Sequence, residues 1–212
     1  GQNRLASGAS SDYLVFSNPD VVVMRETIER MLRILAHDPS VGIVDAKQIP
    51  FEHPKEYDPV SGATSWCSGA FSMVRRDQFS RLGGFDHDTF YMHGDDVDLS
   101  WRLRLSGLTA VHQPAAVVFH DKRFDERGEI EPSSMERYHS AQAALMLAHK
   151  YSRPDIVERL LAYMDSPAAS DLHRKAAATY RSRLQGGTAP APIDPDGTVA
   201  EFVDGHYGRH RW

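Results

Sequence analysis

The stretch of sequence that decides the fold is SGAFSMVRRDQFSRLGGFDHDTFYMHGDDVDLSWRLRLSGLTAVHQPAAVVFH, residues 68–120. Within it, residues 70–74 and 116–119 are short apolar runs that predict buried strands. Between them, residues 76–82 predict a short helix and residues 95–106 a longer one, and glycines close both. The acids and the final histidine of this stretch therefore stand at the ends of predicted elements, where functional side chains are often found.

The residues before this stretch continue the alternation of strand and helix. Residues 13–16 and 41–49 are apolar runs typical of strands, and residues 25–37 carry apolar side chains at helical spacing. Residues 50–64 contain three prolines and no periodicity, which predicts a long loop. Alternating elements of this kind predict an α/β fold.

Helical patterns dominate after residue 120. Ser133 and Glu136 form a capping box that opens an alanine-rich helix to about residue 151. Two more helices are predicted over residues 154–164 and 170–185, and residues 186–197 have the composition of a linker before a docking strand or loose tail. We therefore expect three parts: an α/β portion over 1–125, a helical extension over 126–185, and a linker with a tail over 186–212.

Composition excludes several classes of protein. The formal net charge is −5, so the chain has no basic field that would hold nucleic acid, and no nucleic-acid partner is expected. Cys67 is the single cysteine, which rules out an internal disulfide and fits a reducing compartment. No apolar run approaches the roughly 20 residues that span a bilayer. We therefore expect a cytoplasmic protein.

Asp20 is the first candidate for chemistry. Asn18-Pro19 stops the strand predicted over residues 13–16, so Asp20 lies at the carboxyl end of a strand, where open α/β sheets bind ligands. Its carboxylate could bind a hard divalent cation that bridges a diphosphate. An ordinary Asn-Pro-Asp turn explains the same residues.

Three acids fall in the first turn of the helix predicted over residues 95–106. The free amide groups of a helix start favour negative charge, so a structural role explains at least one of them. Asp98 stands four residues before Arg102, which is the spacing of an intrahelical ion pair. Asp95 and Asp96 point in different directions, so one could act as a general base while the other binds backbone or a substrate hydroxyl.

His120 ends the apolar run of residues 116–119. A histidine combined with a carboxylate gives a nitrogen and oxygen ligand set that suits manganese-like ions better than calcium. The chain has eleven histidines, so an ordinary surface or core position is the competing interpretation.

The segment Trp66-Cys67-Ser68-Gly69 precedes a predicted strand. Trp66 offers a flat apolar face that could lie against a sugar ring, with Ser68 and Gly69 beside it. Core packing of Trp66 and a tight turn at Gly69 are the structural alternative. Cys67 has no neighbouring helix start or cationic partner that would indicate a reactive thiolate.

Five motifs in this order resemble family 2 glycosyltransferases of the GT-A fold, especially the branch of rhamnosyl- and galactofuranosyltransferases. The motifs are NPD at 18–20, SGAFSMVRR at 68–76, GGFD at 83–86, GDDVDLSWRLR at 94–104 and PAAVVFH at 114–120. The resemblance covers roughly residues 1–150. It implies a partial GT-A domain, which is Rossmann-like with a mixed sheet, followed by a C-terminal helical extension.

The resemblance also implies roles for single residues. Asp20 matches the metal-binding acid of the family's DXD site, and Asn18 stands where that motif has its first acid. Asp96 matches the catalytic base of the family's ED pair, and Asp95 stands where the family usually has Glu. His120 matches a histidine that is a metal ligand in several members. The residues assigned to substrate binding are Asn18, Trp66, Ser68, Gly69 and Asp95.

The reaction implied is an inverting displacement, in which an acceptor oxygen attacks the anomeric carbon of a nucleotide-sugar donor while a Mn²⁺- or Mg²⁺-bound nucleoside diphosphate leaves. The implied acceptor is a glycan or a lipid-linked sugar. A lipid-linked acceptor would bring peripheral association with the inner face of the cell membrane. Homo-oligomerisation is left open.

Family members begin with two or so βα units that hold the nucleotide base and ribose, and the segment that follows them matches the first residues of this chain. We therefore expect the chain to be the acceptor-side portion of a longer enzyme, and to bind a sugar nucleotide weakly or not at all by itself. The alternative is a non-catalytic carbohydrate-binding or scaffolding module derived from the same fold. A metal-dependent hydrolase, in which water accepts the sugar, is a third hypothesis.

Overall fold

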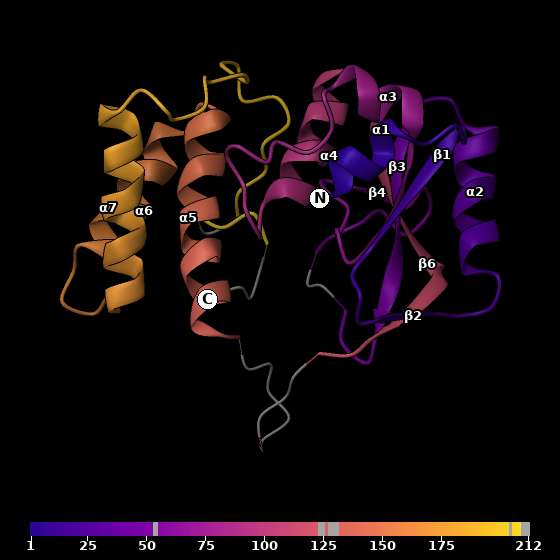
Figure 1. The fold of residues 1–212 in the computed structure, drawn as a ribbon, viewed down its shortest axis with the longest axis horizontal. Coiled ribbons are helices and arrows are strands. Elements are labelled where there is room, and N and C mark those ends of the chain that lie inside the picture. The colour runs from indigo at the N-terminus through magenta and orange to yellow at the C-terminus, as the bar shows by residue number, and fades with distance from the viewer. Residues whose placement is uncertain (53–54, 123–125, 127–131, 204, 209–212) are drawn as a thin grey trace. The chain divides into compact units, whose positions relative to one another are not determined.

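The chain divides into two compact units in the computed structural model (Figure 1). The sheet unit comprises residues 1–86 and 96–122, and the helical unit comprises residues 87–95 and 123–212. The residues that the structure describes are 1–52, 55–122, 126, 132–203 and 205–208.

A six-stranded mixed sheet forms the centre of the sheet unit. Its strands are β1 (Tyr13–Ser17), β2 (Val21–Val23), β3 (Val41–Ile49), β4 (Ala63–Thr64), β5 (Phe71–Arg75) and β6 (Thr109–His120). They lie in the order β1-β5-β3-β6-β2, and β4 pairs with β6 outside this path. Only the β3–β6 ladder is parallel among these pairs. The predicted α/β fold with a mixed sheet is confirmed.

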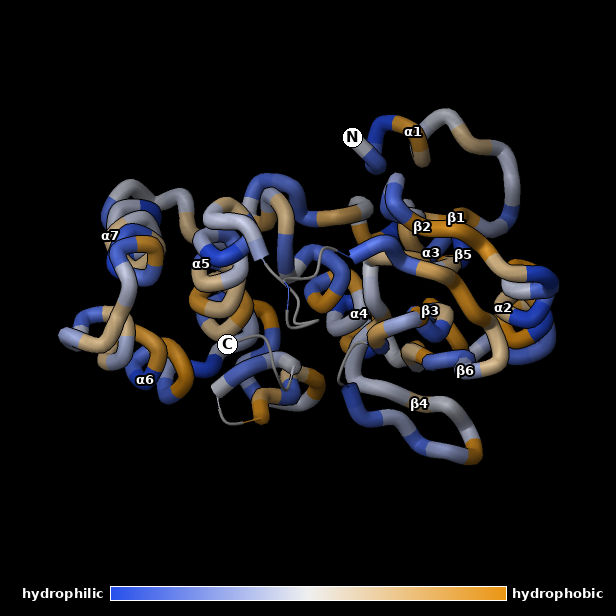
Figure 2. The backbone as a smooth tube through the Cα atoms, turned by 90° about the horizontal axis from the view of Figure 1, so that it is seen from below, coloured by the Kyte–Doolittle hydropathy of each residue, from blue (hydrophilic) through white to orange (hydrophobic). Residues whose placement is uncertain are grey.

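Helices cover both faces of this sheet. They are α1 (Gln2–Ser7), α2 (Thr27–His37), α3 (Arg76–Arg81) and α4 (Asp95–Leu105), of which only the first residue of α4 is grouped with the helical unit. Met31 and Leu35 of α2 pack on one face, and Figure 2 shows hydrophobic and hydrophilic stretches alternating along this helix. Phe79 of α3 and Leu99 of α4 pack on the other face. Each face therefore has its own apolar core.

The parallel ladder of β3 and β6 is interrupted at Pro114. Pairing moves from Ala46 opposite Gln113 to Lys47 opposite Val117, so residues 114–116 have no partner on β3. Proline has no backbone N–H to donate to a ladder, which accounts for an irregularity at this point. The strand predicted over residues 116–119 is therefore the second half of a longer strand that continues through the proline.

A buried ionic cluster lies between β3, β6 and the segment after β3. Asp45 is 1% exposed and pairs with the Lys55 ammonium, itself 2% exposed, and with Nδ1 of His112 at 2.9 Å. Burial would raise the pKa of Asp45, but Lys55 and His112 outweigh it, and the pKa lies below its usual value. Lys55 also donates to the Trp66 carbonyl at 3.1 Å. The long segment predicted as a loop is thus tied to the sheet by a buried charge pair, and it ends in the short strand β4.

Asn3 of α1 holds the turn that follows α3. Its side-chain amide donates to the Phe85 carbonyl at 2.7 Å, and its Oδ1 accepts from the Phe85 amide at 2.9 Å. Gly84, in the same turn, has a φ of +77°, and a Cβ atom there would lie 2.6 Å from Oδ1 of Asn3. The glycine is therefore required both by the backbone conformation and by the close approach of α1.

The described residues of the helical unit include the helices α5 (Ser134–Lys150), α6 (Pro154–Met164) and α7 (Asp171–Gln185). The predicted capping box is confirmed, because Ser133 Oγ accepts from the Glu136 amide at 3.2 Å and Glu136 accepts from the Ser133 amide at 2.7 Å. Residues 186–197, which have the composition of a linker, contact this unit through the Ile193 amide, which donates to the Lys150 carbonyl at 2.8 Å. Within the described parts of the chain, no helix is long and apolar enough to cross a membrane.

Three short elements have no counterpart in the sequence-based prediction: α1, β2 and β4. The other predicted elements agree with the structure to within about two residues at most ends, as is usual for such boundaries. The predicted domain boundary after residue 125 falls outside the described residues.

We expect Gly84→Ala to destabilise the protein more than Gly83→Ala. Both glycines have positive φ, which costs an alanine about 1–2 kcal/mol. Nothing lies within 4 Å of a Cβ at Gly83, whereas a Cβ at Gly84 would displace Asn3, so Gly84→Ala should lose about 1 kcal/mol more. Urea unfolding of the two variants measures the difference, and equal losses would contradict the role given to Asn3.

Replacing Asp45 by asparagine should lower the free energy of unfolding by about 3–5 kcal/mol near neutral pH, because it leaves Lys55 buried without its counter-charge. The exposed Asp77–Arg81 pair provides a control, and Asp77→Asn should change stability by less than about 1 kcal/mol.

The effect of Asp45→Asn should also depend on pH. The pKa of Asp45 is lowered in the folded state, so its stabilisation is complete above the unfolded value and is lost as pH falls through the folded value. The difference between wild type and Asp45→Asn should therefore narrow below about pH 4. If the difference in free energy of unfolding between wild type and Asp45→Asn stayed constant from pH 6 down to the lowest pH at which both fold, the role given to the Asp45 charge would be refuted.

Candidate functional site

Asp20 and His120 are brought together by the pairing of β2 with β6. Val21 lies opposite His120 in this antiparallel ladder, and the Asp121 amide donates to the Asp20 carbonyl at 2.9 Å. As a result, Nε2 of His120 lies 3.4 Å from Oδ1 of Asp20. The side chain of Asp20 is 46% exposed and that of His120 is 10% exposed, so a ligand could approach from the aspartate side.

The surroundings of His120 favour a neutral imidazole. Burial lowers the pKa of His120, Lys122 acts in the same direction, and Asp20 opposes them without reversing the shift. Nδ1 of His120 lies 2.7 Å from Oε1 of Gln48, an atom that can only accept a hydrogen bond. Nδ1 therefore carries the proton, and the lone pair of Nε2 is directed toward the Asp20 carboxylate.

A nitrogen lone pair facing a carboxylate oxygen is a donor set that suits a divalent transition-metal ion. Ligands lie about 2.0–2.6 Å from such ions, so a separation of 3.4 Å allows both atoms to bind the same ion. The described residues contain no group of three His, Cys, Asp or Glu side chains that could hold a metal. Asp20 and His120 could therefore supply two ligands of an ion that takes its remaining ligands from other molecules.

Asp96 lies in the first turn of α4 with both carboxylate oxygens held by backbone. Oδ2 accepts from the Gly69 amide at 2.8 Å, and Oδ1 accepts from the Val97 amide at 2.9 Å. A Cβ atom at Gly69 would lie 3.1 Å from Cβ of Asp96, so the glycine permits this close approach. The side chain is half-buried, and each oxygen keeps a further lone pair that could accept a proton or a hydroxyl.

The neighbouring acids differ from Asp96 in their surroundings. Asp98 is fully buried and accepts from Nε of Arg102 at 2.7 Å, which confirms the predicted ion pair. Arg102 also donates to the carbonyls of Leu82 and Gly84, so the pair fixes the turn that Asn3 holds from the other side. Asp95 is half-buried and is grouped with the helical unit, and its role in acceptor contact stays a prediction.

Trp66 does not offer an open face to a sugar in this structure. Its side chain is 2% exposed, and the Lys55 ammonium lies 5.2 Å from the centroid of its ring. The alternative of core packing describes its position better. Cys67 is buried as well, and burial raises the pKa of its thiol well above the usual value, which agrees with the absence of a reactive thiolate.

Ser68 is buried, whereas Gly69 is half-buried and contacts Asp96. Ser68 is 2% exposed, and its amide donates to Asp45 at 2.6 Å. Asn18 is half-buried, and its amide donates to the Ala70 carbonyl at 2.9 Å, which fixes the turn that leads to Asp20. The Gly69 amide positions Asp96, and the Asn18 amide fixes the turn before Asp20. Direct contact of Asn18, Ser68 or Gly69 with a substrate stays a prediction.

Sequence reasoning missed the polar residues of β3 and β6 that surround the site: Asp45, Gln48 and His112. All three are at most 2% exposed. Part of the signal was present, because Asp45 directly follows the apolar residues 41–44 of a predicted strand, and buried polar groups need partners. Their partners, however, are distant in sequence.

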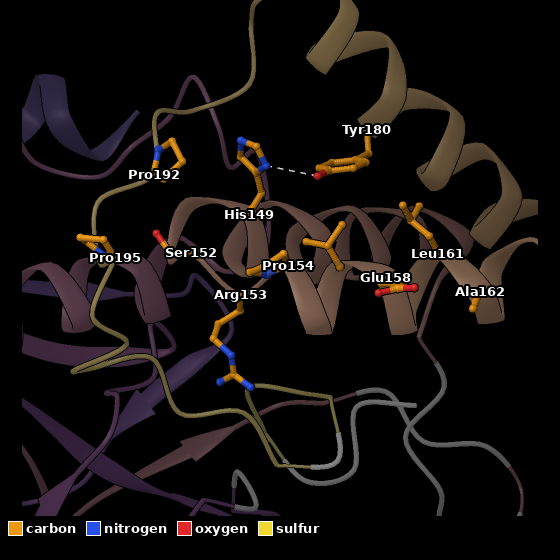
Figure 3. A pocket seen from close by; sticks show the side chains of 11 residues that line it. His149, Ser152, Arg153, Pro154, Glu158, Leu161, Ala162, Tyr180, Pro192 and Pro195 are labelled. Atoms are coloured by element: carbon orange, nitrogen blue, oxygen red, sulfur yellow. Dashed lines mark hydrogen bonds between the residues drawn. The ribbon is translucent and has the colours of Figure 1, made fainter.

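A cavity of about 760 Å³ lies in the helical unit, between the end of α5, α6, α7 and the prolines of the following segment (Figure 3). The Tyr180 hydroxyl lies 3.2 Å from Nδ1 of His149 at its wall. Burial raises the pKa of Tyr180. None of the residues predicted to form the site lines this cavity.

Comparisons with known proteins agree with the motifs. No protein-family model matches the chain. It is 26% identical over 171 residues to the rhamnosyltransferase WbbL of Escherichia coli, covering 67% of this chain and 64% of that protein. It is 34% identical over 95 residues to N-acetylglucosaminyl-diphospho-decaprenol L-rhamnosyltransferase of Mycobacterium tuberculosis, covering 45% of this chain and 30% of that protein.

Among solved structures, the chain is similar to GalNAc-T7 bound to UDP, GalNAc and Mn²⁺, with a TM-score of 0.57 and 11% identity over 90% of this chain and 41% of that chain. This likeness concerns the fold alone. The chain spans less than two thirds of the length of these relatives. Motifs, relatives and fold lead to one conclusion: the chain is a homologue of the rhamnosyltransferases and related glycosyltransferases, and it carries part of the GT-A fold.

Proposed function

We propose that this chain is the acceptor-side portion of a metal-dependent, inverting glycosyltransferase. The observation that carries the proposal is the pairing of β2 with β6, which sets Asp20 and His120 3.4 Å apart, in the same unit as a carboxylate, Asp96, fixed by backbone amides. A binding module requires neither feature. The similarity to two rhamnosyltransferases supports a nucleotide-sugar donor.

In the proposed reaction, Asp96 takes the proton of an acceptor hydroxyl as that oxygen attacks the anomeric carbon of the donor. The bond from this carbon to the diphosphate breaks on the opposite face, so the configuration inverts. The Gly69 and Val97 amides keep the carboxylate oriented, so little reorganisation is needed when the hydroxyl arrives. Asp20 and His120 would hold a divalent ion, Mn²⁺ or Mg²⁺, and such an ion would supply positive charge to stabilise the diphosphate as a leaving group.

The acceptor proposed is a glycan or a lipid-linked sugar. The name of the mycobacterial relative includes a decaprenol-linked acceptor, which supports the lipid-linked alternative. A lipid-linked acceptor would place the reaction at the membrane surface, and peripheral association with the inner face of the cell membrane belongs to this proposal.

Asp96→Asn should lower kcat for sugar transfer by about 10²–10⁴-fold in the protein encoded by the complete gene, because the amide cannot accept the proton. The variant keeps the shape of the side chain, so the donor KM should change little. Asp95→Asn should act mainly on the acceptor KM, and Asp77→Asn, in an exposed ion pair, serves as the unaffected control. Full turnover by Asp96→Asn would eliminate the role of this residue as the base.

Removal of divalent ions with EDTA should abolish transfer, and Mn²⁺ should restore it. The variants Asp20→Asn and His120→Ala should raise the Mn²⁺ concentration for half-maximal rate at least tenfold, because even the loss of an outer hydrogen-bond partner of a metal ligand costs about 10- to 100-fold in affinity. His37→Ala, at the exposed end of α2, is the matched histidine control. Metal-independent transfer would contradict the proposal, and carbohydrate binding without transfer would favour the non-catalytic module.

A further inference from the structure

Gln48 is a buried glutamine at the end of β3 whose two amide atoms both have partners. It is 1% exposed. Oε1 lies 2.7 Å from Nδ1 of His120, and Nε2 donates to Oγ of Ser68 at 3.0 Å. An amide at this depth requires such partners, because leaving one of its groups without a hydrogen bond is unfavourable. The side chain is therefore held in one orientation from both ends.

Ser68 connects Gln48 with the backbone segment that contacts Asp96. Its Oγ accepts from Gln48 and also from the Ala70 amide at 3.3 Å. Its own amide donates to the buried Asp45 carboxylate at 2.6 Å. The next amide along the chain, that of Gly69, donates to Oδ2 of Asp96 at 2.8 Å. The amides of Ser68 and Gly69, which are consecutive in the chain, are thus both fixed by hydrogen bonds. They connect the residue that contacts His120, Gln48, with Asp96.

We propose that Gln48 is a positioning residue for the reaction proposed above, on which this inference rests. Its Oε1 fixes the proton of His120 on Nδ1, which leaves Nε2 free to bind the ion beside Asp20. Its Nε2 donates a hydrogen bond to Ser68 and so restricts the backbone at Ser68 and Gly69. The Gly69 amide is then held in the position from which it donates to Asp96. One side chain then serves both the residues that hold the donor diphosphate and the base that activates the acceptor.

The two halves of this role can be separated by two substitutions. Gln48→Leu removes both hydrogen bonds, whereas Gln48→Glu keeps an acceptor for Nδ1 of His120 and removes the donor to Ser68. Gln113→Leu is the matched control, because Gln113 lies on β6, the strand of His120, and its side chain accepts only from the Ala115 amide in the structure as described.

The first measurement is the tautomer of His120, read from the ¹⁵N chemical shifts of its imidazole. Wild type, Gln48→Glu and Gln113→Leu should have the proton on Nδ1, and Gln48→Leu should lose this preference. The Mn²⁺ dissociation constant, measured with Mn²⁺ alone, should rise about 10- to 100-fold in Gln48→Leu. A folded Gln48→Leu protein with the wild-type tautomer would overturn the proposal.

The second measurement is the amide spectrum of Ser68 and Gly69. Both signals should shift in Gln48→Leu and in Gln48→Glu, and neither should shift in Gln113→Leu. In transfer assays, Gln48→Glu should lower kcat more than it raises the donor KM, because it disturbs Asp96 and keeps the acceptor for Nδ1 of His120. Unchanged Ser68 and Gly69 signals in Gln48→Glu would overturn the link to Asp96. If Gln48→Leu lost the tautomer preference but the wild-type protein had no transfer activity, the role of Gln48 in orienting His120 would be supported. Only the proposed function would then be contradicted.

Discussion

The parallel ladder between β3 and β6 is the constraint on which the rest of the site depends. Its first half sets Asp45 opposite His112, which allows a charge pair to be buried beneath the segment after β3. Its second half begins after the irregularity at Pro114, which shifts the register by three residues. An odd shift exchanges the faces of a strand. The proline therefore helps to decide which side chains of β6 face Gln48, His120 among them.

Around this ladder, two of the three reactive candidates, Asp20 and Asp96, lie nearer the surface than the residues that support the site, whereas His120 is buried. Asp20 is exposed and Asp96 is half-buried, whereas Asp45, Gln48 and Ser68 are almost fully buried. Buried polar side chains restrict one another through short hydrogen bonds, so the exposed groups are held without the entropy cost of being ordered at the moment of binding. This division explains why β3 contains two buried polar residues, Asp45 and Gln48, among apolar ones.

The sequence predicted the elements that carry strong local signals and missed those that depend on distant partners. β3 has the predicted bounds, and the Ser133–Glu136 capping box is present, because both follow from adjacent residues. The three-residue strand β2 exists through its pairing with β6, and α1 is held by Asn3 on Phe85, 82 positions away. Trp66 is buried against Lys55, which pairs with the distant Asp45. The motif resemblance identified Asp20, Asp96 and His120 as candidates. Only the structure shows that Gln48 contacts His120 and that Gly69 donates to Asp96.

The central claim is that a divalent ion binds between Asp20 and His120. Titration of Mn²⁺ into the ¹⁵N-labelled protein tests it most directly, because the paramagnetic ion broadens the amide signals nearest to it. The signals of Asp20, Val21, His120 and Asp121 should broaden first, since their backbones pair in the β2–β6 ladder and the adjoining turn. Broadening that begins at another group of carboxylates, with these four signals unchanged, would contradict the account.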